Sequence, residues 1–439
     1  MIRLLATLIL GISLFSINAS KHALADGSSS IWVNDMDHVV GDVKQGFIQN
    51  RITTQAAADN LINGFKAMKV DGIRIPIFAE GLNPNKTMFD YFYDEAVAAG
   101  FAIYANPAQH SGAARIACGV LNEERCDTLG DNERSQILID RIKDFASEYK
   151  CDWIGPFNED GAPGADWTSN QMNDIFSSLE GQINGADLIG PDVWGIPASI
   201  SVMRETSIGK NIEVAGTHNL GFNHSDWPEF IALAEDNNLP VWDTEVNDND
   251  KFGTGTRLDA ALDADVDGLV LYNSWTMISL TNGSINAAGQ NMMSKYLKFR
   301  TDRTYYIDNL ANRKRLATDG ESESPYTTDI GTTGSDVEWK FVDNGNGYYH
   351  LERAAGGSIS RLRSDNTEFA DMQATSSSGA WTYFNISQGP SPGAYYLSLP
   401  AGPISHNRLQ VTGEGDIKMV TTASPVSYTH LTLPTTPYV

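Results

Sequence analysis

The chain is poor in cysteine and in positive charge. It has three cysteines in 439 residues, too few for a disulfide scaffold. Lys and Arg number 31 against 55 Asp and Glu, and the formal net charge is −24. Because nucleic acid and anionic membrane surfaces repel such a chain, we expect neither as a partner.

Long apolar runs are missing except at the N-terminus. Arg3 precedes an apolar run over 4–17, and Ala23-Leu-Ala25 supplies a small-x-small cleavage site before Asp26. The run is too short for a permanent membrane anchor, so it predicts a signal peptide over residues 1–25. We therefore expect a secreted, extracellular protein.

In an oxidising compartment, Cys118 and Cys126 could close a small loop and leave Cys151 buried and free. Three unpaired thiols are the alternative.

Motifs for cofactors and metals are also absent. No Gly-x-Gly-x-x-Gly turn follows a predicted strand, and the histidines are too scattered for a zinc motif. Asp263-Ala-Asp265-Val-Asp267 has the spacing that opens a calcium loop, but Ser274 stands where the loop needs its glutamate. We expect no cofactor and no metal.

Residues 26–302 alternate short strand-like runs with longer amphipathic segments. Eight such units in roughly 270 residues are typical of a (β/α)8 TIM barrel rather than an open doubly wound sheet. The predicted strands are Ile31–Asp35, Gly72–Phe78, Phe101–Asn106, Asp152–Asn158, Leu188–Trp194, Ile212–His218, Pro240–Thr244 and Gly268–Trp275, and the predicted helices include Thr54–Met68, Met88–Ala99, Glu133–Tyr149, Ser169–Asn184, Trp227–Asn237 and Thr256–Ala264.

Residues 303–425 repeat an all-β pattern three times. A Tyr-Tyr pair leads to an Arg-Leu pair at 315, 361 and 408, with a period of 43 to 47 residues. The first two repeats add a strand with Trp339 or Trp381, and these tryptophans are expected to fill a core. The pattern predicts a small β-trefoil-like domain. The fold class is therefore α/β, a barrel followed by an all-β domain.

The third repeat supplies no tryptophan strand. Residues 426–439 continue neither the repeat nor its aromatic spacing, and they resemble translated cloning sequence. We interpret this tail as non-native and the third repeat as truncated, which predicts lower solubility than for a chain ending near Asp302.

Two of the predicted barrel strands end in carboxylates. Glu159 follows Asp152-Trp-Ile-Gly-Pro-Phe-Asn158, and Glu245 follows Pro240-Val-Trp-Asp-Thr. The C-terminal rim of a TIM barrel is where catalytic groups lie, and two opposed carboxylates are what glycosidic hydrolysis needs. We expect Glu159 to be the general acid and Glu245 the nucleophile or base.

Other polar and aromatic residues lie at or near predicted strand ends. Their chemistry suits hydrogen bonding to sugar hydroxyls or stacking on pyranose rings, whereas core packing or internal ion pairing is the alternative for each. Period-2 alternation places residues 243 and 245 on one face of their strand and Thr244 on the other. The predicted substrate-binding residues are Asn158, His218, Asn219, Trp275, Trp242, Asp243, Arg74 and Glu80, with Trp194 a further aromatic candidate.

The positions of Asn158-Glu159, Glu245 and Trp275 resemble the large glycoside hydrolase clan with (β/α)8 barrels. That resemblance implies an asparagine holding the sugar 2-hydroxyl, an aromatic residue under the cleaved sugar and a retaining mechanism. More narrowly, Ile31-Trp-Val-Asn-Asp-Met-Asp, the run from Gly72 to Gly81 and Gly155-Pro-Phe-Asn-Glu-Asp resemble marine bacterial β-agarases of glycoside hydrolase family 118. The run Glu338-Trp-Lys-Phe-Val-Asp-Asn-Gly-Asn-Gly-Tyr-Tyr-His is similar to a module found on agar-degrading enzymes. This narrower resemblance implies endo-cleavage of β-1,4 bonds in agarose.

The two resemblances disagree on stereochemistry, because the agarase family is associated with inversion. Inversion needs carboxyl groups about 6.5–9.5 Å apart, and retention about 5–5.5 Å. If inversion holds, the base is Glu245 or another rim acid among Asp243, Asp248, Asp160 and Glu80.

The expected partner is a polysaccharide, agarose or a related galactan, and we expect a monomer. One alternative is an endo-hydrolase of porphyran, carrageenan, xylan or glucan, although the acidic chain disfavours sulfated polymers. The other alternative is a carbohydrate-binding protein without activity. The exposed tyrosines and repeated arginines of residues 303–425 could bind galactan.

Overall fold

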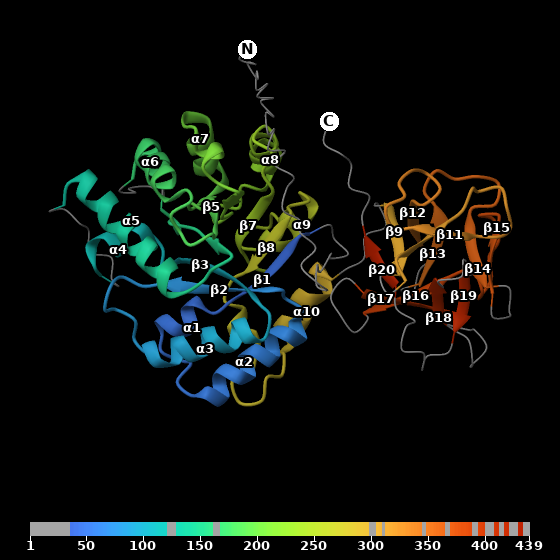
Figure 1. Cartoon of the computed structure of the whole chain (residues 1–439), viewed down its shortest axis with the longest axis horizontal. Helices are drawn as coiled ribbons and strands as arrows, with labels where there is room; N and C mark the ends of the chain where they lie inside the picture. Colours follow the sequence, from blue (N-terminus) through green and yellow to red (C-terminus); the bar gives the residue numbers. More distant parts are fainter. Residues whose placement is uncertain are drawn as a thin grey trace, which may run out of the picture.

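The computed structural model describes residues 36–120, 129–160, 167–297, 304–309, 312–344, 348–364, 369–388, 394–399, 408–411, 417–420 and 429–432. Two separate bodies are visible, a barrel surrounded by helices and a smaller body made only of strands (Figure 1). The predicted fold class is confirmed. None of the described helices is long and apolar enough to span a bilayer.

Eight parallel strands close the barrel in sequence order, and β1 pairs with β8. Val40, Tyr104, Trp153, Ile189 and Trp242 form an apolar layer in the barrel interior together with Val214 and Val270. The strands are β1 His38–Asp42, β2 Gly72–Ile77, β3 Ala102–Pro107, β4 Trp153–Ile154, β5 Asp187–Pro191, β6 Val214–Thr217, β7 Val241–Val246 and β8 Gly268–Leu271.

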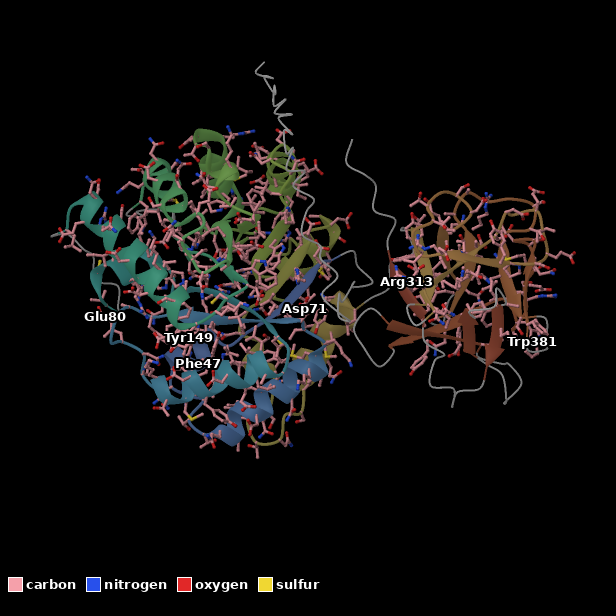
Figure 2. The ribbon with its side chains drawn as sticks, viewed as in Figure 1. Phe47, Asp71, Glu80, Tyr149, Arg313 and Trp381 are labelled. Carbon is pink, nitrogen blue, oxygen red and sulfur yellow. The ribbon has the colours of Figure 1, made fainter. Side chains whose placement is uncertain are left out.

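The helices pack their apolar faces on the outside of the strands and form a single large core with them. Side chains cap several helix starts, for example Thr54 at α2, Thr168 in a capping box at α6 and Thr256 at α9. Aromatic rings fill the core beneath α1 and α3, where Phe47, Phe89 and Tyr149 meet edge to face; Figure 2 labels Phe47 and Tyr149. The helices are α1 Lys44–Ile48, α2 Gln55–Met68, α3 Lys86–Ala98, α4 Gly112–Cys118, α5 Asp131–Glu148, α6 Ser169–Leu179, α7 Ile196–Glu205, α8 Trp227–Glu235, α9 Arg257–Asp263 and α10 Ala287–Tyr296, with short 3-10 turns η1 Ile208–Lys210, η2 His224–Asp226 and η3 Ser274–Met277.

Seven of the eight predicted strands overlap observed strands, and the first is misplaced. Residues 31–35 lie outside the described residues, and β1 instead spans His38–Asp42. The β1 segment is buried because it pairs with both β2 and β8, an interaction that local sequence does not reveal. The helices α1, α4, α7 and α10 were not among those predicted.

The free cysteine is as predicted. Cys151 is free and buried, and its pKa is raised because burial disfavours the thiolate. Cys118 is disulfide-bonded, while Cys126 lies outside the described residues.

The all-β body has three repeats of four strands. Six of them pair in a closed ring, β9–β12–β13–β16–β17–β20, and three hairpins β10–β11, β14–β15 and β18–β19 extend from it. The core draws apolar residues from all three repeats, including Trp339, Phe384 and Leu409. The strands are β9 Thr304–Asn309, β10 Lys314–Ala317, β11 Tyr326–Asp329, β12 Trp339–Asp343, β13 Tyr348–Arg353, β14 Arg361–Ser364, β15 Ala370–Gln373, β16 Phe384–Gln388, β17 Ala394–Ser398, β18 Arg408–Val411, β19 Ile417–Val420 and β20 Thr429–Thr432.

Part of the predicted non-native tail forms strand β20. Its backbone pairs with β9 through Thr432 and Tyr306 and with β17 through His430 and Ala394, so it stands where the third repeat needs a fourth strand. Pairing does not establish the origin of residues 426–439, which stays a prediction.

The repeated arginines of the first two repeats are buried in ion pairs. Arg315 lies 2.7 Å from Asp308, and Arg361 binds Glu352 through two hydrogen bonds. Each also donates to the carbonyl of a turn, at Thr332 or at Ser377. These arginines therefore stabilise their own repeats, and their guanidinium groups are buried and not available to a ligand.

Candidate active site

The acidic strand ends come together at one end of the barrel. Glu159 lies five residues after β4 and adopts φ +58°, a left-handed conformation that costs a non-glycine residue about 1 kcal/mol. Its backbone N–H donates to the Asp192 carbonyl at 3.2 Å, and the bridge between Asp160 and Val193 extends the pairing of these two segments. The β4 and β5 segments therefore hold the strained turn that presents Glu159.

Glu245 lies within β7, where the ladder with β8 is irregular. The register shifts between Asp243 and Val246, which marks a bulge. As a result Thr244 donates to Asp192 while its neighbour Glu245 accepts from Arg74 on β2, so both side chains face the barrel interior. The alternation that placed residues 243 and 245 on one face and Thr244 on the other is wrong, because the bulge interrupts the period of two.

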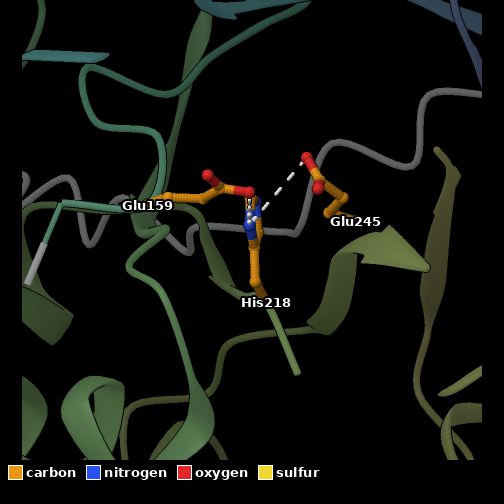
Figure 3. Close-up of side chains that lie close together, drawn as sticks. All are labelled: Glu159, His218 and Glu245. Atoms are coloured by element: carbon orange, nitrogen blue, oxygen red, sulfur yellow. Dashed lines mark ion pairs between the residues drawn. The ribbon is translucent and has the colours of Figure 1, made fainter. Parts of the chain in front are cut away.

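His218, which directly follows β6, lies between the two glutamates (Figure 3). Its Nδ1 is 3.6 Å from Glu159 Oε1 and 4.0 Å from Glu245 Oε2. One side-chain atom from each of the three residues lies within 4.8 Å of the others. The prediction that Glu159 and Glu245 face one another is thus matched by the structure, and His218 joins them.

A second carboxylate fixes the other side of the imidazole. Asp192 Oδ1 lies 3.2 Å from His218 Nε2, and both side chains are fully buried. Asp192 also accepts hydrogen bonds from Tyr104 and Asn106 on β3 and from Thr244 on β7. Neither ring nitrogen of His218 reaches hydrogen-bond geometry, so the attraction across these contacts is that of ion pairs.

Arg74 on β2 binds Glu245 through two hydrogen bonds. Its guanidinium places Nη1 and Nη2 each 3.1 Å from Glu245 Oε2, and its remaining donors reach Asn158 and Asn106. Lys44 Nζ likewise donates to Asn106, Asn158 and the Pro107 carbonyl at 2.7–2.9 Å. Arg74 was predicted to contact substrate or to form an internal ion pair, and its complete burial matches the ion pair.

The amide of Asn158 is engaged at both ends. Its Oδ1 accepts from Lys44, Arg74 and Asn106, and its Nδ2 donates to the Gln109 carbonyl at 2.8 Å. These bonds hold the turn before Glu159, whereas the expected bond to a sugar 2-hydroxyl stays a prediction.

The protonation states follow from this arrangement. Burial favours neutral imidazole, but the charges of Glu245 and Asp192 outweigh it and raise the pKa of His218 to about 9. Burial also raises the pKa of Glu245, and the charge of Glu159 adds to this, giving about 7. For Glu159, burial alone would raise the pKa, but the charged imidazole of His218 outweighs it and lowers the pKa to about 2. Between these two values the pair carries one proton, on Glu245, and it loses this proton as the pH rises through about 7.

Three residues of the site escaped the sequence analysis. Asp192 and Lys44 lie in segments without a motif. Tyr272 directly follows β8, close enough to the acids of the site to feel their charge. Burial, Glu245, Asp42 and Glu159 raise the pKa of Tyr272 to about 12. A polar residue near the C-terminal end of a predicted strand was the signal available for Asp192, in Leu188–Trp194, and it is also the position of His218 in Ile212–His218.

Trp242 and Glu80, two of the predicted substrate-binding residues, lie outside the cluster of Glu159, His218 and Glu245. Trp242 is only 1% exposed and packs on Trp153 in the interior layer, so the prediction that it stacks on a sugar is wrong. Glu80 is exposed after β2, away from the barrel centre in Figure 2, and no contact in the described part of the chain joins it to the glutamates. Trp275 is half-buried in η3, where its indole N–H donates to Asn273, and Asn219 is buried beside His218.

Among the described residues, the other acids proposed as bases do not belong to the cluster of Glu159, His218 and Glu245. Asp160 accepts backbone bonds from Asn158, Ala113 and Ala114, and Asp248 pairs with Lys295 at 2.5 Å. Asp243 is buried, and its Oδ1 accepts the N–H of Glu245 at 3.2 Å. Burial raises the pKa of Asp243 to about 6, although Arg257 lowers it. Among these acids, Glu245 is the one placed opposite Glu159.

Glu159, His218 and Glu245 are also the described residues best placed to hold a metal ion. However, Glu245 Oε2 already accepts two bonds from Arg74, whose positive charge disfavours a metal cation beside it. Asp267, in the stretch with the spacing of a calcium loop, accepts a hydrogen bond from the Val241 N–H at 2.6 Å.

No family model matches this chain. No curated protein matches its sequence either. Solved structures that match include ThreeFoil, a designed threefold symmetric protein, at 17% identity over 29% of this chain and 97% of that chain, with a TM-score of 0.25. An exo-β-1,3-galactanase from Clostridium thermocellum matches at 15% identity over 30% of each chain, with a TM-score of 0.25. A GlcNAcα1-4Gal-releasing endo-β-galactosidase from Clostridium perfringens matches at 15% identity over 30% of this chain and 32% of that chain, with a TM-score of 0.26. The match thus spans about a third of the length of the last two proteins.

Proposed function

We propose that this protein is a secreted, endo-acting glycoside hydrolase that cleaves β-1,4 linkages of agarose with two carboxyl groups. The observation that carries the proposal is the pair Glu159 and Glu245, which face each other within 4.8 Å at the end of the barrel and have pKa values moved in opposite directions. Hydrolysis of a glycosidic bond needs one carboxylic acid and one carboxylate in this relation. Agarose as the substrate rests on the sequence resemblance alone.

The chemistry divides into two steps. One carboxyl group protonates the leaving glycosidic oxygen while the other, ionised, attacks the anomeric carbon and forms a glycosyl ester. The first group, now ionised, then takes a proton from water, which attacks the same carbon and releases the sugar. The short separation supports this retaining route, because an inverting pair needs about 6.5–9.5 Å to admit a water.

Two lines of support disagree on which glutamate is the acid. The resemblance assigns the acid to Glu159 and the nucleophile to Glu245, which Arg74 orients with two hydrogen bonds. The order of the two pKa values instead favours the proton on Glu245. We therefore assign the proton and the anion to the pair, and its members are to be distinguished by experiment.

The first experiment is a proton NMR time course of agarose digestion. Retention predicts that the β-anomer of the new reducing galactose appears first, whereas an initial α-anomer would overturn the retaining route. A panel of porphyran, carrageenan, xylan and glucan tests the substrate. Failure of all five polymers would favour the rival of a binding protein without activity.

Azide then assigns the roles. Loss of the nucleophile in Glu245→Ala predicts an α-glycosyl azide product, and loss of the acid in Glu159→Ala predicts a β-glycosyl azide. The opposite pair of products would reverse the two roles. Because azide replaces the missing carboxylate in either case, each variant serves as the control for the other.

The all-β body is proposed to be a carbohydrate-binding β-trefoil on a monomeric enzyme. The ring of six strands with three hairpins supports this reading. Since Arg315 and Arg361 are buried, galactan would meet exposed aromatic residues such as Tyr326 rather than these arginines. Affinity electrophoresis in agarose, comparing the full chain with one ending at residue 302, tests the proposal; equal retardation would contradict it.

A further inference from the structure

An exposed aromatic ring lies on a tightly held loop after β7. Asp250 accepts the backbone N–H groups of Phe252, Gly253 and Thr254 on Oδ1 and that of Gly255 on Oδ2, at 2.8–3.2 Å. Gly253 and Gly255 adopt φ +68° and +92°, which glycine accepts without strain. The loop is therefore preorganised, and it leaves the Phe252 side chain 68% exposed.

Phe252 rests against a second ring from the neighbouring loop. Its centroid is 5.0 Å from that of Phe222 at an interplanar angle of 88°, an edge-to-face contact. Phe222 has φ +54°, a conformation that persists at such a bulky residue only where the surroundings enforce it. His224 Nδ1 lies 3.1 Å from the Thr254 carbonyl and ties the two loops together.

Packed contacts lead from these rings to the catalytic strand. The Arg257 guanidinium carbon lies 6.0 Å from the Phe222 ring centroid, and Arg257 Nη1 donates to the Glu245 carbonyl at 3.0 Å. On the other side, Gly221 approaches the Trp194 indole so closely that a Cβ there would lie 3.3 Å from it. Phe252 thus lies on the loop that follows β7, and Phe222 on the loop that follows β6. Glu245 lies in β7, and His218 directly follows β6.

Single exposed apolar residues are ordinary on protein surfaces, and Val97 on α3 is one, 46% exposed. Phe252 differs because its loop is fixed and because its aromatic support, Phe222, lies against Arg257, which donates to the Glu245 carbonyl. A planar ring offers its face to the C–H face of a pyranose, and the chain's formal charge of −24 favours a neutral sugar over a sulfated one.

We propose that Phe252, supported by Phe222, is a stacking platform for a neutral sugar ring of the polysaccharide, outside the position of bond cleavage. This inference rests on the proposed hydrolase function and adds a specificity-determining residue to it. Binding energy gained at Phe252 favours polymer over short substrates, because only a long chain reaches both the platform and the glutamates.

The test compares wild type, Phe252→Ala and Phe252→Trp on agarose and on short agaro-oligosaccharides. For Phe252→Ala we expect KM on agarose to rise about threefold to tenfold, the equivalent of one aromatic contact, with kcat and the rate on the shortest cleaved oligosaccharide unchanged. Phe252→Trp should restore KM, and Val97→Ala serves as the matched control for loss of an exposed apolar side chain.

The outcomes distinguish failure of the stacking platform from failure of the hydrolase function. Wild-type KM for Phe252→Ala on agarose would overturn the platform and leave the hydrolase standing. An equal loss on polymer and on short oligosaccharides would also overturn it, since that result means a general defect. Wild type inert towards all five polymers would overturn the hydrolase and the platform with it. Melting temperatures verify folding, and we expect that of Phe252→Ala to equal wild type because the ring is exposed.

Discussion

The imidazole of His218 lies 3.2 Å from Asp192, and both side chains are completely buried. Asp192 has its own bonds to Tyr104, Asn106 and Thr244, so three strands determine where it stands. Because Asp192 fixes one nitrogen of His218, it also fixes the orientation of the other nitrogen, which faces Glu159. The ring is a positioning element whose charge also separates the pKa values of the acids.

Asp192→Asn should lower activity without removing either glutamate. The charge that helps to raise the pKa of His218 is lost, so the imidazole becomes neutral at a lower pH and Glu159 loses an attraction. We expect kcat/KM to fall about tenfold to a hundredfold, as for a misplaced catalytic group, and the pH profile to shift. A pH profile of wild-type shape with only reduced amplitude would contradict this electrostatic role.

Glu159→Gln should reduce kcat by about 10²–10⁴, the usual worth of a general acid or base. Asp248→Asn is the matched control, because Asp248 is another acid near the same barrel end that is already paired with Lys295 and should leave kcat unchanged. If Asp248→Asn were as inactive as Glu159→Gln, the pair would be wrongly chosen.

Activity should decline above neutral pH. The pKa of Glu245 is raised to about 7 and that of Glu159 is lowered to about 2, so the singly protonated pair exists between these values. As pH rises through about 7 the proton is lost, and kcat/KM should fall about tenfold per pH unit. A profile that stays level to pH 9 would show that the pair is not the proton source.

Asp243→Asn should stabilise the protein at alkaline pH and not at acidic pH. The folded-state pKa of Asp243 is raised to about 6, so its contribution to stability is present below pH 4 and is lost as pH rises through 6. Urea unfolding at pH 8 should show a gain of about 1–3 kcal/mol in the variant, with little difference at pH 4. Unchanged agarose cleavage would also exclude Asp243 as the base, whereas a loss of kcat like that of Glu159→Gln would reinstate it.

Arg74→Met should strongly destabilise the barrel. It leaves Glu245 buried without its cation and removes donors from Asn158 and Asn106, a loss of about 3–5 kcal/mol in the free energy of unfolding. Arg204→Gln is the control, because its ion pair with Glu229 is exposed and should contribute less than about 1 kcal/mol. Similar losses for both variants would contradict the difference in burial.

Ending the chain at residue 425 should lower the melting temperature of the all-β body and not that of the barrel. The pairings of β20 with β9 and with β17 would be lost, which opens the ring. Differential scanning calorimetry measures the two transitions. An unchanged all-β transition would show that β20 adds nothing to stability.

The sequence predicted the architecture well, because periodicity and repeats are local signals. Alternation of strands and helices indicated eight barrel units, and the spacing of Arg315, Arg361 and Arg408 indicated three β repeats. It also singled out Glu159, His218 and Glu245, since each lies in or just after a recognisable strand.

What local pattern could not predict depends on contacts between distant segments. A bulge in β7 decided which way Glu245 faces, and burial in the interior layer decided that Trp242 is core. Asp192, Lys44 and Tyr272 carry no motif, and their place at the site follows only from the closure of the barrel.

By itself, then, the sequence determined the element order, the strand ends and the residue types available for acid chemistry, because these depend on neighbours along the chain. The tertiary structure decided how Asp192, His218 and the two glutamates share charge. Burial and the distances between groups far apart in sequence set those pKa values, and neither exists before the barrel closes.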